Sequence, residues 1–124
     1  MEGILSIALG GALGGVSRYL AGNLSVKYFG DSLPYGTFLI NIIGCFFMGL
    51  LMTLIVGRGL LPPIGRLFLC VGFLGGFTTF SSFGYETLTL LEEGNLVMAA
   101  AYACGSVLLG VLAAGIGVLA AHIF

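Results

Sequence analysis

Short polar connections divide the chain into apolar segments, and each segment is long enough to cross a lipid bilayer. A membrane helix needs roughly 20 predominantly apolar residues to span about 30 Å of hydrocarbon. The connections, at residues 27–35, 57–65 and 92–95, contain glycine, proline or adjacent glutamates. The sequence therefore predicts an all-α integral membrane protein with four transmembrane helices, at about residues 4–26, 36–56, 64–91 and 96–123.

The composition indicates a single membrane domain, residues 1–124, with almost no soluble part. Of the 124 residues, 59% are hydrophobic and 7% are charged, whereas ordinary globular chains carry about 25% charged residues. The first segment carries Glu2 and lacks the positive flank of a secretory signal, so we expect it to be retained as a span. The net charge of -1 and the absence of a basic run argue against a nucleic-acid partner and leave the lipid bilayer as the expected surroundings.

The residue patterns of an enzyme are missing. The sequence contains no His/Asp/Ser or Cys/His constellation, no embedded pair of carboxylates and no phosphate-binding glycine loop with a lysine. Cys45, Cys70 and Cys104 lie in apolar stretches without a CxxC motif, so we interpret them as small packing residues. We expect a protein that is not an enzyme.

The third apolar segment contains a stretch that is a poor uniform helix, Gly72 to Gly84, GFLGGFTTFSSFG. Gly75 and Gly76 each weaken a helix by about 1 kcal/mol relative to alanine, and the threonines and serines that follow can bond nearby backbone groups. We expect the third helix to be broken near residues 75–79. A broken membrane helix is tolerated only where it is buried in protein or lines a polar cavity or an ion site, so the break points to function.

Two polar side chains stand inside other spans. Arg18 costs about 2.5–3.5 kcal/mol on insertion scales, so it either faces a cavity or a partner or snorkels to the interface. Asn41 either joins two helices or acts as an anion ligand, since its amide offers two donors and one acceptor. The residues alone leave both pairs of alternatives open.

Other side chains share helix faces. Phe80 and Phe83 lie three residues apart and so point the same way, and core packing is the usual role of such a pair. Tyr102 and Ser106 lie one turn apart on the fourth helix, where interhelical hydrogen bonding is the simpler interpretation.

The positive charges leave the orientation of the chain nearly undecided. With four spans, Arg58 and Arg66 lie on the side of both termini, and Lys27 lies on the other side. The count of positive charges is two against one, or two against two if Arg18 is counted with Lys27. Because orientation follows Lys and Arg in short loops, such balance allows insertion in both directions. Oppositely inserted copies could form an antiparallel dimer in which residues near the two-fold axis meet their own copies.

Three stretches resemble the signature segments of the Fluc (CrcB) family of fluoride ion channels. They are GGALGGVSRY (Gly10 to Tyr19), GTFLINIIGCFFMG (Gly36 to Gly49) and GFLGGFTTFSSFGYE (Gly72 to Glu86). The resemblance covers all four spans in order and spacing, and the third stretch is highly specific. Ser82 stands where the family more often has threonine, which keeps the hydroxyl.

The resemblance implies a channel for passive, fluoride-selective export across a cell membrane, a bacterial inner membrane in this family. It implies a dual-topology antiparallel homodimer with two fluoride pores, each lined by both subunits. By position, Phe80 and Phe83 resemble the phenylalanines whose ring edges contact fluoride, and Asn41 resembles the pore asparagine. Candidates for the remaining polar lining are Thr37, Ser81, Ser82, Tyr102 and Ser106.

The resemblance also implies a central structural sodium ion, Na+, at the dimer interface. Gly75 and Thr78 resemble the residues at the break whose backbone carbonyls, two from each subunit, hold that ion. Arg18 resembles the first-helix arginine near the aqueous vestibule. Glu86 falls at an acidic family position and receives no role.

Two other classes compete with this interpretation. A small multidrug-type proton-coupled exporter shares the short four-span plan, but it needs an embedded carboxylate, ordinarily in the first helix. Glu2, at its very end, is the only acid of the first span, and the chain has no tryptophan. A purely structural membrane subunit would not explain Arg18 or the hydroxyl-rich break, because buried polar groups are costly.

Overall fold

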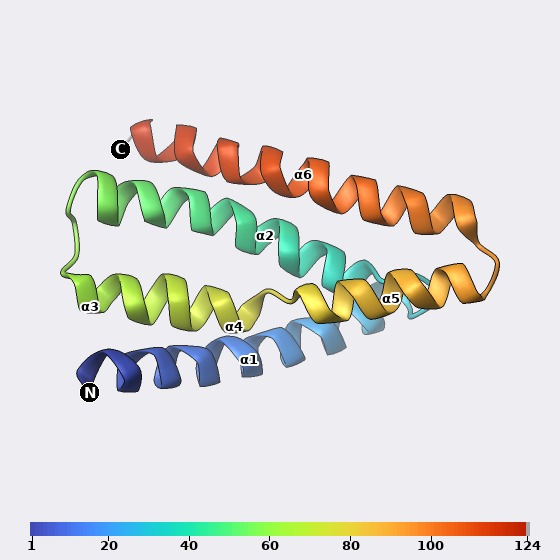
Figure 1. Ribbon diagram of the computed structural model, residues 1–124, viewed down its shortest axis with the longest axis horizontal. Helices are drawn as coiled ribbons and strands as arrows, with labels where there is room; N and C mark the ends of the chain where they lie inside the picture. The colour runs from blue at the N-terminus through green and yellow to red at the C-terminus, as the bar shows by residue number, and fades with distance from the viewer. Residues whose placement is uncertain (124) are drawn as a thin grey trace.

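The computed structural model describes residues 1–123, which form a bundle of helices with short connections (Figure 1). Both termini and the turn after the second crossing lie at one end, and the other two turns lie at the opposite end. All four crossings are long and apolar enough to span a membrane, which confirms a multi-pass, all-helical chain. The elements are α1 (Glu2–Phe29), α2 (Tyr35–Met52) with the π-helical η1 (Thr53–Gly57), α3 (Pro63–Arg66), the π-helical η2 (Leu67–Leu74), α4 (Gly75–Phe77), α5 (Phe80–Glu92) and α6 (Leu96–Ile123).

Local sequence explains where the crossings begin and end. Gly30, at the end of α1, has a φ of 79°, a left-handed conformation that favours glycine. Pro63 occupies the first turn of α3, where a missing N–H does no harm. The Asn95 Oδ1 accepts a 3.3 Å hydrogen bond from the Met98 N–H and so caps α6.

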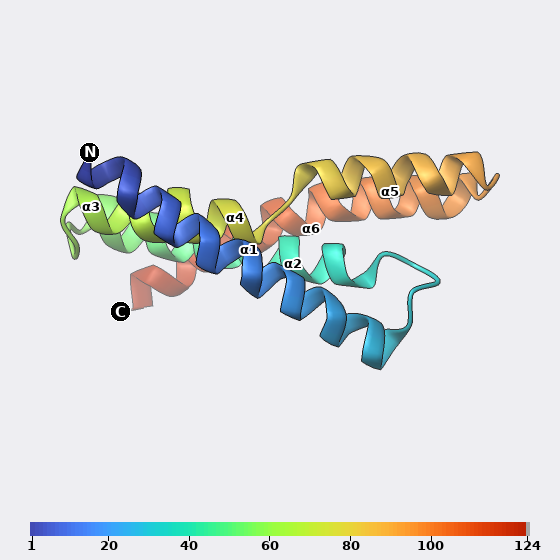
Figure 2. The ribbon, with the colours of Figure 1, turned by 90° about the horizontal axis from the view of Figure 1, so that it is seen from below.

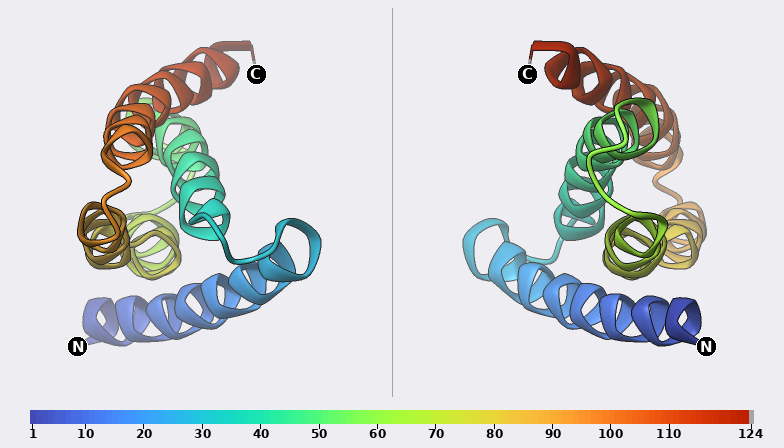
Figure 3. Two further views of the ribbon diagram at one scale, coloured as in Figure 1. Left: turned by 90° about the vertical axis from the view of Figure 1, so that its right-hand side faces the viewer. Right: turned by 90° about the vertical axis from the view of Figure 1, so that its left-hand side faces the viewer.

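Glycines bring neighbouring crossings into backbone contact. On α1, Gly10 and Gly14 are buried, and a Cβ on either would collide with a main-chain oxygen of η2. A Cβ on Gly76 would lie 2.7 Å from the Gly11 oxygen. The end views show α1 beside the third crossing and α6 beside α2 (Figure 3). Lipid provides no hydrophobic driving force between helices, so close packing at these small-residue seams holds the helices together.

The extended part of the third crossing is Thr78 and Thr79, which is shorter than the break predicted near residues 75–79. Gly75 has helical angles, with φ -62° and ψ -36°, and α4 continues to Phe77. Thr78 (φ -84°, ψ 158°) and Thr79 (φ -150°, ψ 117°) are extended, and α5 begins directly after them. Gly76 allows close packing on α1 rather than ending the helix.

The bundle is open at the end that contains the α1–α2 connection. There the end of α1 diverges from α5 and the first half of α6, which stay side by side (Figure 2). The small buried core at this end is Leu90, Ala99 and Tyr102, with Phe83 packed against it. This core holds α5 against α6.

We predict that Gly117→Ala lowers the free energy of unfolding by about 1–3 kcal/mol, the usual cost of overpacking. The added Cβ would collide with the Phe46 carbonyl oxygen on α2. Gly115→Ala is the matched control, since nothing lies within 4 Å of its added Cβ. Denaturant titration in detergent, followed by circular dichroism, measures both variants. Equal destabilisation of the two would contradict a tight α2–α6 seam.

Candidate functional site

One amide side chain satisfies both backbone groups of an extended residue at the break. The Asn41 Nδ2 donates to the Thr79 carbonyl oxygen at 3.1 Å, and the Asn41 Oδ1 accepts from the Thr79 N–H at 2.9 Å. Asn41 therefore joins α2 to the third crossing. The second N–H of the Asn41 amide takes part in neither bond and can donate to a ligand.

At the break, two N–H groups bond to acceptors other than those of a continuous helix. In a regular helix, the Thr79 N–H would bond the Gly75 oxygen and the Ser82 N–H would bond the Thr78 oxygen. Instead, the Thr79 N–H donates to Asn41, and the Ser82 N–H donates to the Thr79 Oγ1 at 3.2 Å. The Gly75 and Thr78 oxygens thus lose their regular helical donors.

Arg18 lies at the same break. Its Nε donates to the Gly76 carbonyl oxygen at 3.0 Å, across 58 residues of sequence. A cation at the C-terminal end of α4 satisfies a free carbonyl and complements the helix dipole. Of the alternatives for Arg18, the structure favours a partner inside the protein over an isolated snorkelling side chain.

A hollow of about 320 Å³ lies beside the break. Phe80 and Phe83 line it with ring centroids 5.8 Å apart, and Ser106 lines it with a buried Oγ that has no hydrogen-bond partner among residues 1–123. Phe80 is 82% exposed. The full lining is Asn41, Gly44, Cys45, Met48, Thr78, Thr79, Phe80, Phe83, Ser106 and Val107.

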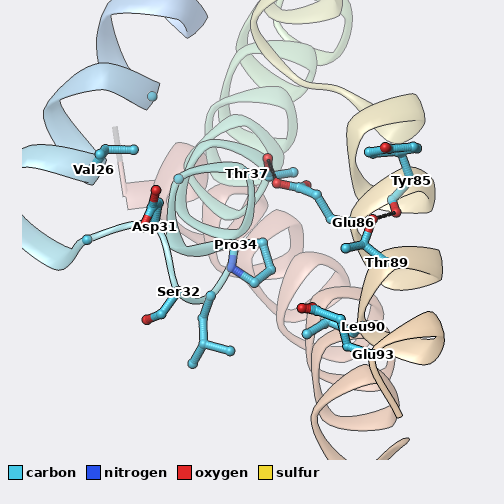
Figure 4. Close-up of a pocket in the computed structure, with 14 residues that line it drawn as sticks. Val26, Asp31, Ser32, Pro34, Thr37, Tyr85, Glu86, Thr89, Leu90 and Glu93 are labelled. Carbon is cyan, nitrogen blue, oxygen red and sulfur yellow. Dashed lines mark hydrogen bonds between the residues drawn. The ribbon is translucent and has the colours of Figure 1, made fainter. Parts of the chain in front are cut away.

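A second hollow, of about 530 Å³, lies at the open end of the bundle between the α1–α2 connection and α5 (Figure 4). Thr37 and Glu86 point toward each other across it, and the Thr37 Oγ1 donates to the Glu86 Oε2 at 3.1 Å. The Tyr102 hydroxyl donates to the Glu86 Oε1 at 3.1 Å. Tyr102 also packs on Phe83, with centroids 5.1 Å apart, and so contacts one lining residue of each hollow.

Glu86 is the residue that sequence reasoning left without a role. It receives hydrogen bonds from α2 and α6 while belonging to α5. An acidic group inside an apolar span is by default a candidate functional residue, and that signal was present in the sequence. Its two hydroxyl partners were not predictable, because they come from distant parts of the chain.

Three of the predicted lining residues, Ser81, Ser82 and Tyr102, line neither hollow. The hydroxyls of Ser81 and Ser82 lie 3.3 and 3.2 Å from the Thr79 Oγ1, at the start of α5. Neither residue lines either hollow. Because Phe80 and Phe83 share the face toward the first hollow, the intervening serines point away from it.

Side chains offer little to a metal ion. Within residues 1–123, no group of three or more His, Cys, Asp or Glu residues lies close enough together to hold one. Any cation at the break would therefore depend on main-chain oxygens. The diverted hydrogen bonds make Gly75 and Thr78 suitable for that role.

Comparison with known proteins places the chain in a family. Residues 5–118 match the family model described as CrcB-like protein, Camphor Resistance (CrcB). The chain belongs to the CrcB family. It is 52% identical to the fluoride-specific ion channel FluC of Chloroflexus aurantiacus, over 95% of this chain and 94% of that protein. This CrcB-family chain is also 45% identical to the protein of the same name from Geotalea uraniireducens, over 98% of each.

A third relative, from Anaeromyxobacter dehalogenans, has the same name and is 48% identical over 92% of this chain and 90% of its own. The names of these relatives describe channels and not enzymes. The prediction that this CrcB-family chain is not an enzyme is therefore confirmed.

We predict that Asn41→Ala destabilises the fold by about 1–3 kcal/mol for each Thr79 backbone group left unpaired. Asn41→Asp keeps the acceptor for the Thr79 N–H and loses the donor, so its loss should be intermediate. Asn23→Ala, on an exposed position of α1, is the control. Denaturant titration in detergent compares the three variants. If Asn41→Ala were no less stable than Asn23→Ala, the amide bridge would not support the break.

Proposed function

We propose that this chain is a fluoride-selective channel that allows passive fluoride export. The observation that carries the proposal is the convergence of Asn41, Phe80, Phe83 and Ser106 on one hollow beside the break. This convergence occurs in a chain about half identical to proteins named fluoride-specific ion channels. The fold, the polar groups and the relatives all support the same activity.

The lining suits a small, strongly hydrated anion. An ion moving from water into an apolar medium loses tens of kcal/mol of solvation in the Born limit, so the path must supply donors. The remaining Asn41 N–H and the unpaired Ser106 hydroxyl are such donors. Aromatic ring edges are positive, so Phe80 and Phe83 offer weak contacts that an anion can leave. Weak sites in series favour conduction over trapping.

A second, antiparallel copy would complete the pore. Phe80 is 82% exposed although its partner ring, Phe83, packs against the small core. An aromatic residue that lines a hollow and is otherwise uncovered fits an interface with another subunit. The even balance of positive charges supports insertion in both orientations. Two such copies would make two pores, and crosslinking that found only monomers in active membranes would refute this assembly.

The Gly75 and Thr78 oxygens support a structural Na+ at the two-fold axis. Both have lost their regular helical donors, and carbonyl oxygens are suitable ligands for hard cations. Two antiparallel copies would present four oxygens. When bound, the ion supplies a fixed positive charge that stabilises an anion nearby.

Proton-coupled export is the second candidate, and Glu86 is the observation that favours it. Glu86 is a carboxyl group within a membrane crossing. Its two oxygens are already engaged by Thr37 and Tyr102, which leaves it less free to exchange protons with a cationic substrate.

Efflux from proteoliposomes decides between these functions. Vesicles loaded with either fluoride or chloride, without a proton gradient, should lose fluoride rapidly and retain chloride. Fluoride retention together with proton-driven transport of a cationic substrate would support the exporter, and no transport of either would leave a structural subunit.

We predict that Phe80→Ile and Phe83→Ile slow fluoride efflux by about tenfold or more, the equivalent of ~1.4 kcal/mol of lost barrier stabilisation. The physical reason is the loss of positive ring edges from the hollow. Phe47→Ile is the control, because Phe47 lines neither the hollow beside the break nor the hollow at the open end. Size-exclusion chromatography checks that assembly is unchanged. Normal efflux in both variants would exclude the ring-edge role.

We predict that Na+ raises the thermal midpoint of the purified protein relative to K+ or N-methylglucamine at equal ionic strength. A ligand at 100 times its Kd stabilises the native state by about 2.7 kcal/mol. Asn41→Ala should weaken this response, since Asn41 holds the extended Thr79 that follows the Gly75 and Thr78 oxygens. Midpoints independent of the cation would contradict a sodium site.

A further inference from the structure

Two sulfur-containing side chains line the hollow beside the break. Cys45 and Met48 both belong to α2 and both face the same cavity as Asn41 and Phe80. Residues three apart on a helix are neighbours, with Cβ atoms roughly 5–6 Å apart. The two side chains therefore leave α2 as neighbours, and neither takes part in the anion path proposed above.

We propose that Cys45 and Met48 form a binding site for a soft monovalent cation, Cu+ or Ag+, and that its occupation stops anion passage. Thiolate and thioether sulfur select soft cations, whereas carbonyl and carboxylate oxygens suit hard ones. This site is therefore chemically distinct from a main-chain oxygen site for Na+ at Gly75 and Thr78.

The Ser106 hydroxyl is a second feature of the hollow that fits a polar or ionic occupant. Its Oγ is buried, lines the same cavity and has no partner among residues 1–123. Leaving a buried hydroxyl unpaired costs about 1–3 kcal/mol, so such groups are normally satisfied by a ligand or water. The cavity of about 320 Å³ greatly exceeds the ~30 Å³ share of one water molecule.

The other cysteines provide internal comparisons. Cys70 is 2% exposed and Cys104 is exposed. Neither lines a described cavity. Among the three thiols, Cys45 alone combines access to the hollow with a thioether neighbour.

Binding is a ligand exchange without oxidation. The Cys45 S–H bond breaks, its electron pair forms the S–Ag bond, and the proton passes to water. The Met48 sulfur donates a lone pair as the second ligand. The bound cation fills part of the hollow and attracts any anion beside it, and conduction fails where one site binds too tightly. The block rests on the proposed channel function, but the binding does not.

The binding test uses silver nitrate and the full chain in chloride-free buffer. A variant with Cys70→Ser and Cys104→Ser retains Cys45 alone, and adding Cys45→Ser removes it. We expect the first to retain about one Ag+ per chain after desalting and the second almost none, by elemental mass spectrometry. Adding Met48→Leu to the first variant should lower the glutathione concentration that strips Ag+ by about tenfold, equivalent to ~1.4 kcal/mol. Equal Ag+ retention with and without Cys45, or no effect of Met48→Leu, would overturn the site.

The block test measures fluoride efflux from vesicles of the same variants with and without Ag+. Efflux through the Cys45-only channel should slow by about tenfold or more and recover with dithiothreitol. The ratio of the two rates should stay near one when Cys45 is also replaced. Silver that binds without slowing efflux would overturn the block. If no variant conducts fluoride without silver, the channel function fails, while the silver count still decides the site.

Discussion

The main-chain groups of the third crossing must be satisfied inside the membrane, and the rest of the structure depends on how this is done. Hydrocarbon offers no hydrogen bonds, so an extended residue there needs partners from the protein. The Asn41 amide supplies a donor and an acceptor to Thr79, Arg18 supplies a donor to Gly76, and the Thr79 hydroxyl caps α5. Three crossings thus cooperate to keep two residues extended.

Glycine packing determines whether these partners can reach the break. Gly11 touches Gly76, and Arg18 lies seven residues after Gly11, about two turns along the same face of α1. The close approach at Gly10, Gly11 and Gly14 therefore brings the guanidinium to a free carbonyl. Larger residues in this seam would move α1 away, and the Gly76 oxygen would lose its partner. Backbone packing and the polar site are parts of one arrangement.

Much of this architecture was predictable from the sequence, because each crossing is a long apolar segment and each turn carries glycine, proline or acidic residues. The position of the extended backbone was predictable only approximately. Low helix propensity at Gly75 and Gly76 suggested a break there, but both glycines are helical and Gly76 packs closely on α1. Propensity is a local quantity, and here a contact with a distant helix overrides it.

The site was predictable where residue type alone carried the signal. Asn41, Phe80 and Ser106 were singled out as polar or aromatic groups in apolar spans, and the fold brings them to one hollow. The hydroxyl partners of Glu86 could not be predicted, because Thr37 and Tyr102 lie 49 and 16 residues away and meet only after folding. The orientation of Ser81 and Ser82 away from the hollow could not be predicted without knowing where α5 begins.

The Asn41–Thr79 pairing also constrains the order of biosynthesis. Ribosomal synthesis delivers α2 to the bilayer before the third crossing, so the Asn41 amide is already in place when Thr79 emerges. A permuted chain that made the third crossing first would expose unpaired main-chain groups to lipid during insertion. The order of segments along the chain thus matches the order in which their polar partners are needed.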